Sequence, residues 1–119
     1  HEYLGACLDV ANSICAGEWP DETIDCLAEH TINLHIKDYQ FKLDPYGVGF
    51  CIEGTPMGNG LTNIQSLLSK FIDTEISAIY EHWLPWPGNF EDAKKNEDKW
   101  TAESIVYLKS LTSELIQNQ

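Results

Sequence analysis

Basic residues are scarce in this sequence, which contains 7 lysine and arginine residues against 19 aspartate and glutamate residues. The formal net charge is therefore −12 at pH 7, which is typical of a solvated acidic surface. A protein that wraps duplex DNA needs a footprint of lysine and arginine to displace counterions from the phosphates. The scarcity of basic residues therefore disfavours a nucleic-acid partner.

Long apolar runs are also missing. None approaches the length that a membrane-spanning helix needs, so we expect no membrane partner. No basic segment followed by an apolar stretch indicates a signal peptide. A chain of 119 residues with 43% hydrophobic content suffices for one compact core, and we expect a single domain over residues 1–119.

The cysteines lack the spacing of a metal or redox pair. Cys7, Cys15, Cys26 and Cys51 form no C-x-x-C pattern, which disfavours a zinc ribbon or a thioredoxin-like site. Disulfide scaffolds are normally shorter and richer in cysteine. Cys7 and Cys26 have apolar neighbours, where free cysteine behaves as a small hydrophobic residue. We therefore expect reduced thiols and a cytoplasmic protein.

Strand-like and helix-like segments alternate along the chain. Residues 4–10, 31–38 and 76–83 are short apolar or alternating runs typical of strands. A helix is expected over residues 20–30, a second from residue 61, and a third capped by Thr101. The expected buried face of that last helix consists of Ile105, Leu108, Leu111 and Leu115.

This alternation favours an α/β protein with parallel strands. Between the second strand and its helix, residues 39–60 are expected to form a loop that is long enough to have a function. Three parallel strands cannot close a barrel, and a TIM barrel takes about 250 residues. We therefore expect the chain to be part of a larger unit, and residues 1–119 alone to associate or to require that missing part.

Asp9, His35 and Glu81 each lie at or near the C-terminal end of an expected strand. Ligands bind at the C-terminal ends of parallel strands in α/β proteins. Alternation places Asp9, His35 and Glu81 on one face of the sheet if the strands are in register. Two carboxylates and one imidazole suit a divalent cation. The alternatives for the single residues are a helix cap, a hydrogen-bonded core histidine and a partner of a lysine.

Four segments resemble the sugar isomerase/epimerase family, also described as xylose isomerase-like. They are L-G-A-C-L-D-V-A-N ending at Asn12, L-H-I-K-D ending at Asp38, the G-T-P-M-G-N-G loop over residues 54–60, and I-Y-E-H-W containing Glu81. In that order they are similar to the family's Asp strand, its His-x-Lys-Asp strand, its Pro-x-Gly-x-Gly loop and its closing strand with a metal-binding Glu.

The resemblance implies a fold, a metal site and a reaction. The fold would be the C-terminal three βα units, strands six to eight, of a TIM (β/α)8 barrel. Asp9, His35 and Glu81 would bind a divalent metal ion (Mn, Mg, Co or Zn), with a fourth ligand, a Glu, upstream of residue 1. The protein would be a metal-dependent isomerase or epimerase of a sugar or sugar phosphate. Glu81 would also be catalytic, moving a proton next to a carbonyl through a metal-stabilised enediolate.

Several residues near these segments have weaker assignments. Asn12 and Lys37 are candidates for binding sugar hydroxyls, and an ion pair of Lys37 with Asp38 or a helix is the structural alternative. Trp83 and Trp86 are candidates for a pocket wall or for the core. His82 is expected to point away from the face of Glu81 and to be structural. The glycine loop lacks the ending of a phosphate cradle.

Other activities stay open at this point. A dehydratase of cyclic polyols, of the inosose type, has the same layout. An abasic-site endonuclease has a related barrel, but its pattern places His where Asn12 stands and an Asp-x-His after the seventh strand. The isolated fragment is expected to be inactive or non-catalytic. The expected partners are a small sugar or sugar phosphate and either a second copy or the missing N-terminal part.

Overall fold

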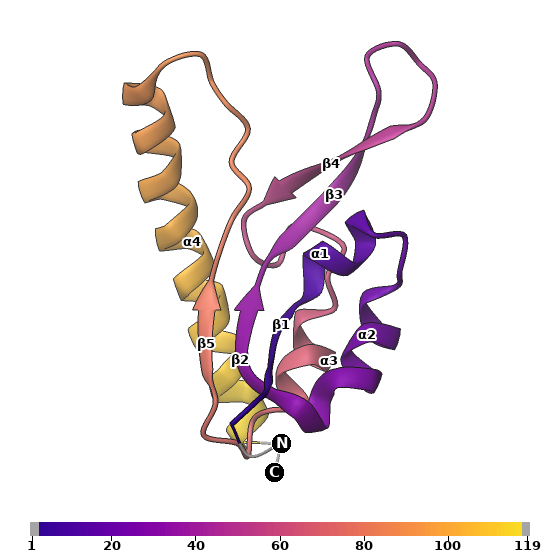
Figure 1. The fold of residues 1–119 in the computed structure, drawn as a ribbon. Helices are drawn as coiled ribbons and strands as arrows, with labels where there is room; N and C mark the ends of the chain where they lie inside the picture. The colour runs from indigo at the N-terminus through magenta and orange to yellow at the C-terminus, as the bar shows by residue number, and fades with distance from the viewer. Residues whose placement is uncertain (1–2, 118–119) are drawn as a thin grey trace.

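The computed structural model describes residues 3–117, which form an α/β fold around a three-stranded parallel sheet (Figure 1). The strands are β1 (Ala6–Asp9), β2 (Thr31–Ile36) and β5 (Ser77–Tyr80), in the spatial order β1-β2-β5. Both pairings are parallel, as the alternation of strands and helices predicts. All three strands therefore end at the same edge of the sheet.

Helices cover one face of this sheet. They are α1 (Val10–Cys15), α2 (Pro20–Leu27) with a 3₁₀ turn η1 (Ala28–His30), α3 (Ile64–Ser69) and α4 (Phe90–Gln117). Leu8 and Leu34 point from the sheet into the core, where they meet apolar side chains of α2, α3 and α4. The core consists of Leu8, Val10, Ile24, Leu34, Ile36, Met57, Ile64, Leu67, Phe71 and Leu111.

The opposite face of the sheet is polar and uncovered. The register aligns Cys7, Asn33 and Ser77 across the three strands. The amide of Asn33 donates to Ser77 Oγ over 2.6 Å, and the Cys7 thiol lies 3.5 Å from Asn33 Oδ1. On the same face, Ile79 is 48% exposed. Alternation along the strands therefore separates a buried apolar face from an open polar one.

The expected loop over residues 39–60 is wrong, because most of it is a β-hairpin. β3 (Asp38–Leu43) pairs antiparallel with β4 (Phe50–Thr55). β3 begins one residue after β2 ends, and the hairpin extends beyond the C-terminal ends of the parallel strands (Figure 1). Gly47 and Gly49, both with positive φ, form the tip, a backbone conformation that favours glycine.

The hairpin has one apolar and one polar face. Opposite residues Phe41 and Ile52 lie on the apolar face, where the rings of Phe41 and Phe50 are 4.7 Å apart. On the other face, Lys42 pairs with Glu53 at 3.0 Å. This period-two pattern was present in the sequence, but the many glycines and the prolines of the segment outweighed it in the prediction.

The last helix begins earlier than expected. α4 starts at Phe90, where the Asn89 side chain accepts a hydrogen bond from the Asp92 amide at 2.9 Å, so Thr101 is not its cap. Asn is a favoured residue before a helix, and the acids of the first turn suit the helix dipole. Leu111 is buried as expected, whereas Ile105 is 38% exposed.

Two smaller expectations also differ. The outer strands are shorter than predicted, since Val10 already belongs to α1 and residues 81–83 follow β5. Cys7 and Cys26 do not pack as small hydrophobic residues in the core, because all four cysteines are exposed and unbridged. Cys7 is exposed because it lies on the uncovered face of the sheet. Within the described chain, no helix is both long and apolar enough to cross a membrane.

Candidate metal centre

Asp9 ends β1 and begins α1, and its two carboxylate oxygens have different partners. Oδ1 accepts hydrogen bonds from the backbone amides of Ala11 and Asn12 at 3.1 and 3.2 Å, so Asp9 caps α1. Oδ2 accepts from Lys37 Nζ at 2.7 Å. The helix-cap alternative for Asp9 is therefore correct, yet the cap uses one oxygen and leaves the other facing the strand ends.

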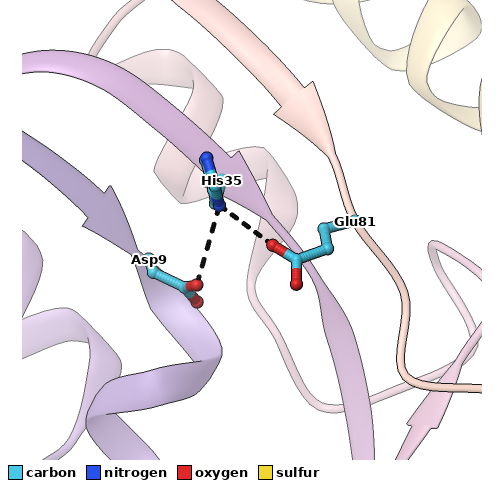
Figure 2. A group of neighbouring side chains, drawn as sticks. All are labelled: Asp9, His35 and Glu81. Atoms are coloured by element: carbon cyan, nitrogen blue, oxygen red, sulfur yellow. Dashed lines mark hydrogen bonds and ion pairs between the residues drawn. The ribbon is translucent and has the colours of Figure 1, made fainter.

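His35 and Glu81 complete a cluster at the ends of the three parallel strands (Figure 2). His35 Nδ1 lies 2.9 Å from Glu81 Oε2 and 3.9 Å from Asp9 Oδ2. The Glu81 backbone is held by its amide, which donates to the Ile36 carbonyl at 3.0 Å. The three side chains are half-buried, and one ligand atom from each lies within 4.8 Å of the others.

Lys37 lies between the two carboxylates. Its ammonium is 2.7 Å from Asp9 Oδ2 and 3.1 Å from Glu81 Oε1, and its side chain is only 4% exposed. The predicted alternative, an ion pair of Lys37 with Asp38, is not observed. A buried lysine needs such partners because an unpaired charge is costly to bury. Lys37 therefore balances one of the two negative charges of the cluster.

Trp83 forms one wall beside this lysine. The Lys37 ammonium lies 4.7 Å from the centre of the Trp83 ring, in cation–π contact. Gly54 of β4 approaches the Trp83 backbone so closely that a Cβ there would lie 2.4 Å from the Trp83 carbonyl oxygen. The hairpin thus packs against the segment after β5. Trp86, the other candidate for the pocket wall, is 61% exposed and makes an edge-to-face contact with the ring of Phe90.

His82 has the structural role that was expected. Its ring packs between Tyr80 and Trp100, away from the cluster. Burial lowers the pKa of His82, against smaller opposing effects of Glu97 and Glu81. Its Nδ1 atom is buried without a hydrogen-bond partner. This environment favours the neutral imidazole and separates His82 from the chemistry of His35.

Asn12 is not brought into the cluster. It lies exposed in the first turn of α1, and its backbone amide, rather than its side chain, contacts Asp9. The structure therefore gives Asn12 a place near the strand ends but no side-chain contact with Asp9, His35 or Glu81.

The donors of the cluster fit a divalent cation. Asp9 and Glu81 offer hard oxygen atoms, and His35 offers an imidazole nitrogen, a mixture found for manganese, magnesium, cobalt and zinc. Two carboxylates at this separation repel each other unless positive charge lies between them. Lys37 supplies one positive charge between them. The spacing of the three ligand atoms suits a bound divalent cation as the second source of positive charge.

Sequence reasoning missed the role of Asp38 and the contact between Trp83 and Lys37 at this edge of the sheet. Asp38 was considered only as a partner of Lys37, but it is 1% exposed and binds the glycine loop. The sequence contained no signal for these contacts, because the loop amides lie 20 to 24 residues after Asp38, beyond the hairpin. The contact of Trp83 with Lys37 had no signal in the sequence, since it depends on how the segment after β5 folds back.

Comparison with known proteins agrees with this fold. Over 107 residues the chain is 41% identical to 3-oxo-isoapionate decarboxylase of Pectobacterium atrosepticum, covering 88% of the chain and 39% of that protein. A crystal structure of a xylose isomerase domain protein from Planctomyces limnophilus superposes with a TM-score of 0.71 at 18% identity. That superposition covers 98% of the chain and 40% of that structure.

No protein-family model matches the chain. The chain spans 39% of the length of the decarboxylase relative. The fold that the sequence resemblance implies is nevertheless supported, because the chain superposes on part of a xylose isomerase domain protein over nearly its whole length.

Proposed function

Since the chain has the fold of a xylose isomerase-like domain, we propose that it provides three ligands of a divalent cation in a carbohydrate-converting enzyme. The observation on which this proposal rests is the convergence of Asp9, His35 and Glu81 at the ends of three adjacent parallel strands. We further propose that the chain corresponds to strands six to eight of a TIM (β/α)8 barrel. Three parallel strands and a 40% share of the matched structure support that placement.

The proposed reactions have one chemical step in common, the formation of an enolate next to a carbonyl group. A bound divalent cation would supply positive charge that polarises the carbonyl oxygen. Glu81 is 41% exposed at its side chain, so a substrate can reach its carboxylate. In an isomerase, Glu81 would remove the proton from the carbon beside the carbonyl and deliver a proton to the neighbouring carbon. In an epimerase, Glu81 would act on one face of that carbon, and a second acid from the rest of the protein would return a proton to the same carbon on the opposite face.

The similarity to a decarboxylase favours formation of the enolate by loss of carbon dioxide instead of by removal of a proton. In a 3-oxo acid, the bond between the carboxylate carbon and the neighbouring carbon breaks, carbon dioxide leaves, and the electron pair enters the enolate. A proton then adds to that carbon, and Glu81 in its protonated form would deliver it. We therefore propose loss of carbon dioxide from a 3-oxo sugar acid as the first reaction to assay, with isomerisation or epimerisation of a sugar or sugar phosphate as the second.

An activity assay on the complete protein tests this proposal. After reconstitution with manganese, we expect carbon dioxide release from a 3-oxo sugar acid, measured by a coupled bicarbonate assay. If the second reaction applies, proton NMR in heavy water will show exchange of the hydrogen beside the carbonyl of a sugar or sugar phosphate. Chelation should abolish either signal. The proposal is wrong if the manganese-loaded protein gives neither carbon dioxide nor exchange.

A partner for the open face of the sheet is part of the proposal. Cys7 and Ile79 are exposed there, and in a barrel such positions are filled by side chains from across the interior. Within the described residues, β1 and β5 each pair with β2 alone, so their outer edges offer unpaired backbone groups. We propose that the remaining part of the barrel, or failing that a second copy, covers these surfaces.

Sedimentation of a chain limited to residues 1–119 tests whether the open face and the strand edges require a covering partner. We expect species heavier than a monomer, in proportions that rise with concentration, because the open face and the edges are then uncovered. Co-expression with the remaining part of the protein should give a single soluble species instead. A monodisperse monomer at all concentrations would contradict this prediction.

A further inference from the structure

Asp38 is a buried acid with an unusual set of partners. It follows Lys37 directly and is 1% exposed. Its Oδ1 atom accepts hydrogen bonds from the backbone amides of Tyr39 and Thr62 at 2.9 and 3.0 Å. Its Oδ2 atom accepts from the amides of Gly58 and Gly60 at 2.9 and 2.8 Å. Four backbone donors therefore compensate the charge of this carboxylate.

These contacts attach the glycine loop, taken from here on to extend from residue 54 through Thr62, to the start of the hairpin. Gly60 passes so close to Asp38 that a Cβ there would lie 2.2 Å from Asp38 Oδ1. Among the described residues, no lysine or histidine forms an ion pair with Asp38, so the amides alone hold it. Hydrogen bonds to a charged acceptor are among the stronger ones in proteins.

The same loop also holds the backbone of Lys37. The Thr62 hydroxyl donates to the Lys37 carbonyl at 3.0 Å. On the other side of Lys37, the Ile36 carbonyl accepts the amide of Glu81 at 3.0 Å. The lysine backbone is therefore fixed on both sides, which matters because a lysine side chain has a flexible four-carbon stem. Its ammonium then meets Asp9 and Glu81.

We propose that Asp38 is a positioning residue for the metal centre. It touches none of the reacting groups. By binding the glycine loop, it fixes the Lys37 backbone so that the ammonium bridges Asp9 and Glu81 and sets the separation of these two carboxylates. The inference deepens the proposed function and rests on it.

The acceptor pattern of Asp38 makes Asp38→Asn a sharp test, although the two side chains have almost the same shape. Each carboxylate oxygen accepts two amide hydrogens. In either orientation, the asparagine NH₂ group would face two N–H donors and accept neither. Asp44→Asn is the matched control, because Asp44 accepts the Tyr46 amide at 2.8 Å in the exposed hairpin turn, away from Lys37.

A double-mutant cycle on the complete protein measures whether Asp38 acts through Lys37. The variants are Asp38→Asn, Lys37→Met and the double variant, and the readouts are kcat and the affinity for manganese alone. We expect Asp38→Asn to lower both by about 10- to 100-fold, as for outer partners of metal ligands. The double variant should be no worse than Lys37→Met, whereas Asp44→Asn should resemble the wild type.

A purely structural role of Asp38 predicts a different cycle. The effects of Asp38→Asn would then add to those of Lys37→Met in both readouts, and such additivity would overturn the inference. The inference would also be overturned if Asp38→Asn had the same kcat and manganese affinity as the wild type. If Asp38→Asn does not fold, Thr62→Val replaces it, with Thr62→Ser expected to restore the hydrogen bond to the Lys37 carbonyl. Thr62→Val indistinguishable from Thr62→Ser would likewise contradict the inference.

The two readouts separate this inference from the proposed function. A wild-type protein that binds manganese but converts no tested carbohydrate refutes the proposed reaction, and the cycle in manganese affinity still decides the role of Asp38. A wild-type protein that does not bind manganese refutes the metal centre and the role of Asp38 together. An active wild type with additive variants refutes the role of Asp38 alone.

Discussion

Glu81→Gln in the complete protein is expected to lower kcat by about 10²- to 10⁴-fold, the range for loss of a general acid or base. The amide has almost the same shape as the carboxylate but neither binds nor releases a proton at physiological pH. Glu81 lies directly after β5 at the open strand ends, where a substrate can reach its carboxylate. Measurement of kcat at saturating manganese separates the loss of proton transfer from weaker metal binding.

The control for this experiment is Glu53→Gln. Glu53 is also an acid that pairs with a lysine, Lys42, but it lies on the polar face of the hairpin. Exposed pairs of this kind contribute little to stability, so kcat should stay close to that of the wild type. Circular dichroism should be the same for both variants. Undiminished turnover in Glu81→Gln would place the proton-transferring group elsewhere in the protein.

Asp9→Asn is expected to weaken manganese binding by roughly 100-fold or more, since loss of a ligand should exceed the loss of an outer partner. The change also leaves the Lys37 ammonium with one carboxylate instead of two. Asparagine caps helices as well as aspartate does, so the hydrogen bonds that the amides of Ala11 and Asn12 donate to Oδ1 can persist. The metal site should therefore be lost while α1 is kept.

Isothermal titration with manganese and thermal unfolding of the metal-free protein check the two halves of this prediction. Asp9→Ala is the matched comparison, because it removes both the ligand and the cap of α1. It should lower the stability of the metal-free protein by about 1 kcal/mol more than Asp9→Asn does. Equal manganese affinity in the wild type and Asp9→Asn would show that Asp9 is no ligand.

Strand patterning was the most reliable part of the prediction from the sequence. Side chains alternate along a strand whatever surrounds it, so the shared face of Asp9 and His35 and the position of Glu81 at the strand ends followed from spacing. The role of these residues as ligands stays a prediction. The parallel order of the strands also followed, because each is separated from the next by helical segments.

The contacts within the site could not be predicted in the same way. The long side chain of Lys37 can reach several acidic residues, and the two that it contacts, Asp9 and Glu81, are far from it in the sequence. Three of the four amides that Asp38 binds lie 20 to 24 residues further along, in the glycine loop. Such contacts depend on how the loop closes in space. Sequence spacing contains no information on that closure.

The hairpin offers an attachment point for probes that report on the site without altering it. Its tip, around Tyr46 and Val48, is almost fully exposed and extends away from the parallel strands (Figure 1). Asp38 lies between this tip and Lys37 and accepts hydrogen bonds from three amides of the glycine loop. A fluorophore or tether at the tip would therefore sit on a hairpin whose base is held by these hydrogen bonds. Distances measured from the tip would report on the position of the hairpin relative to the rest of the protein before and after a substrate is added.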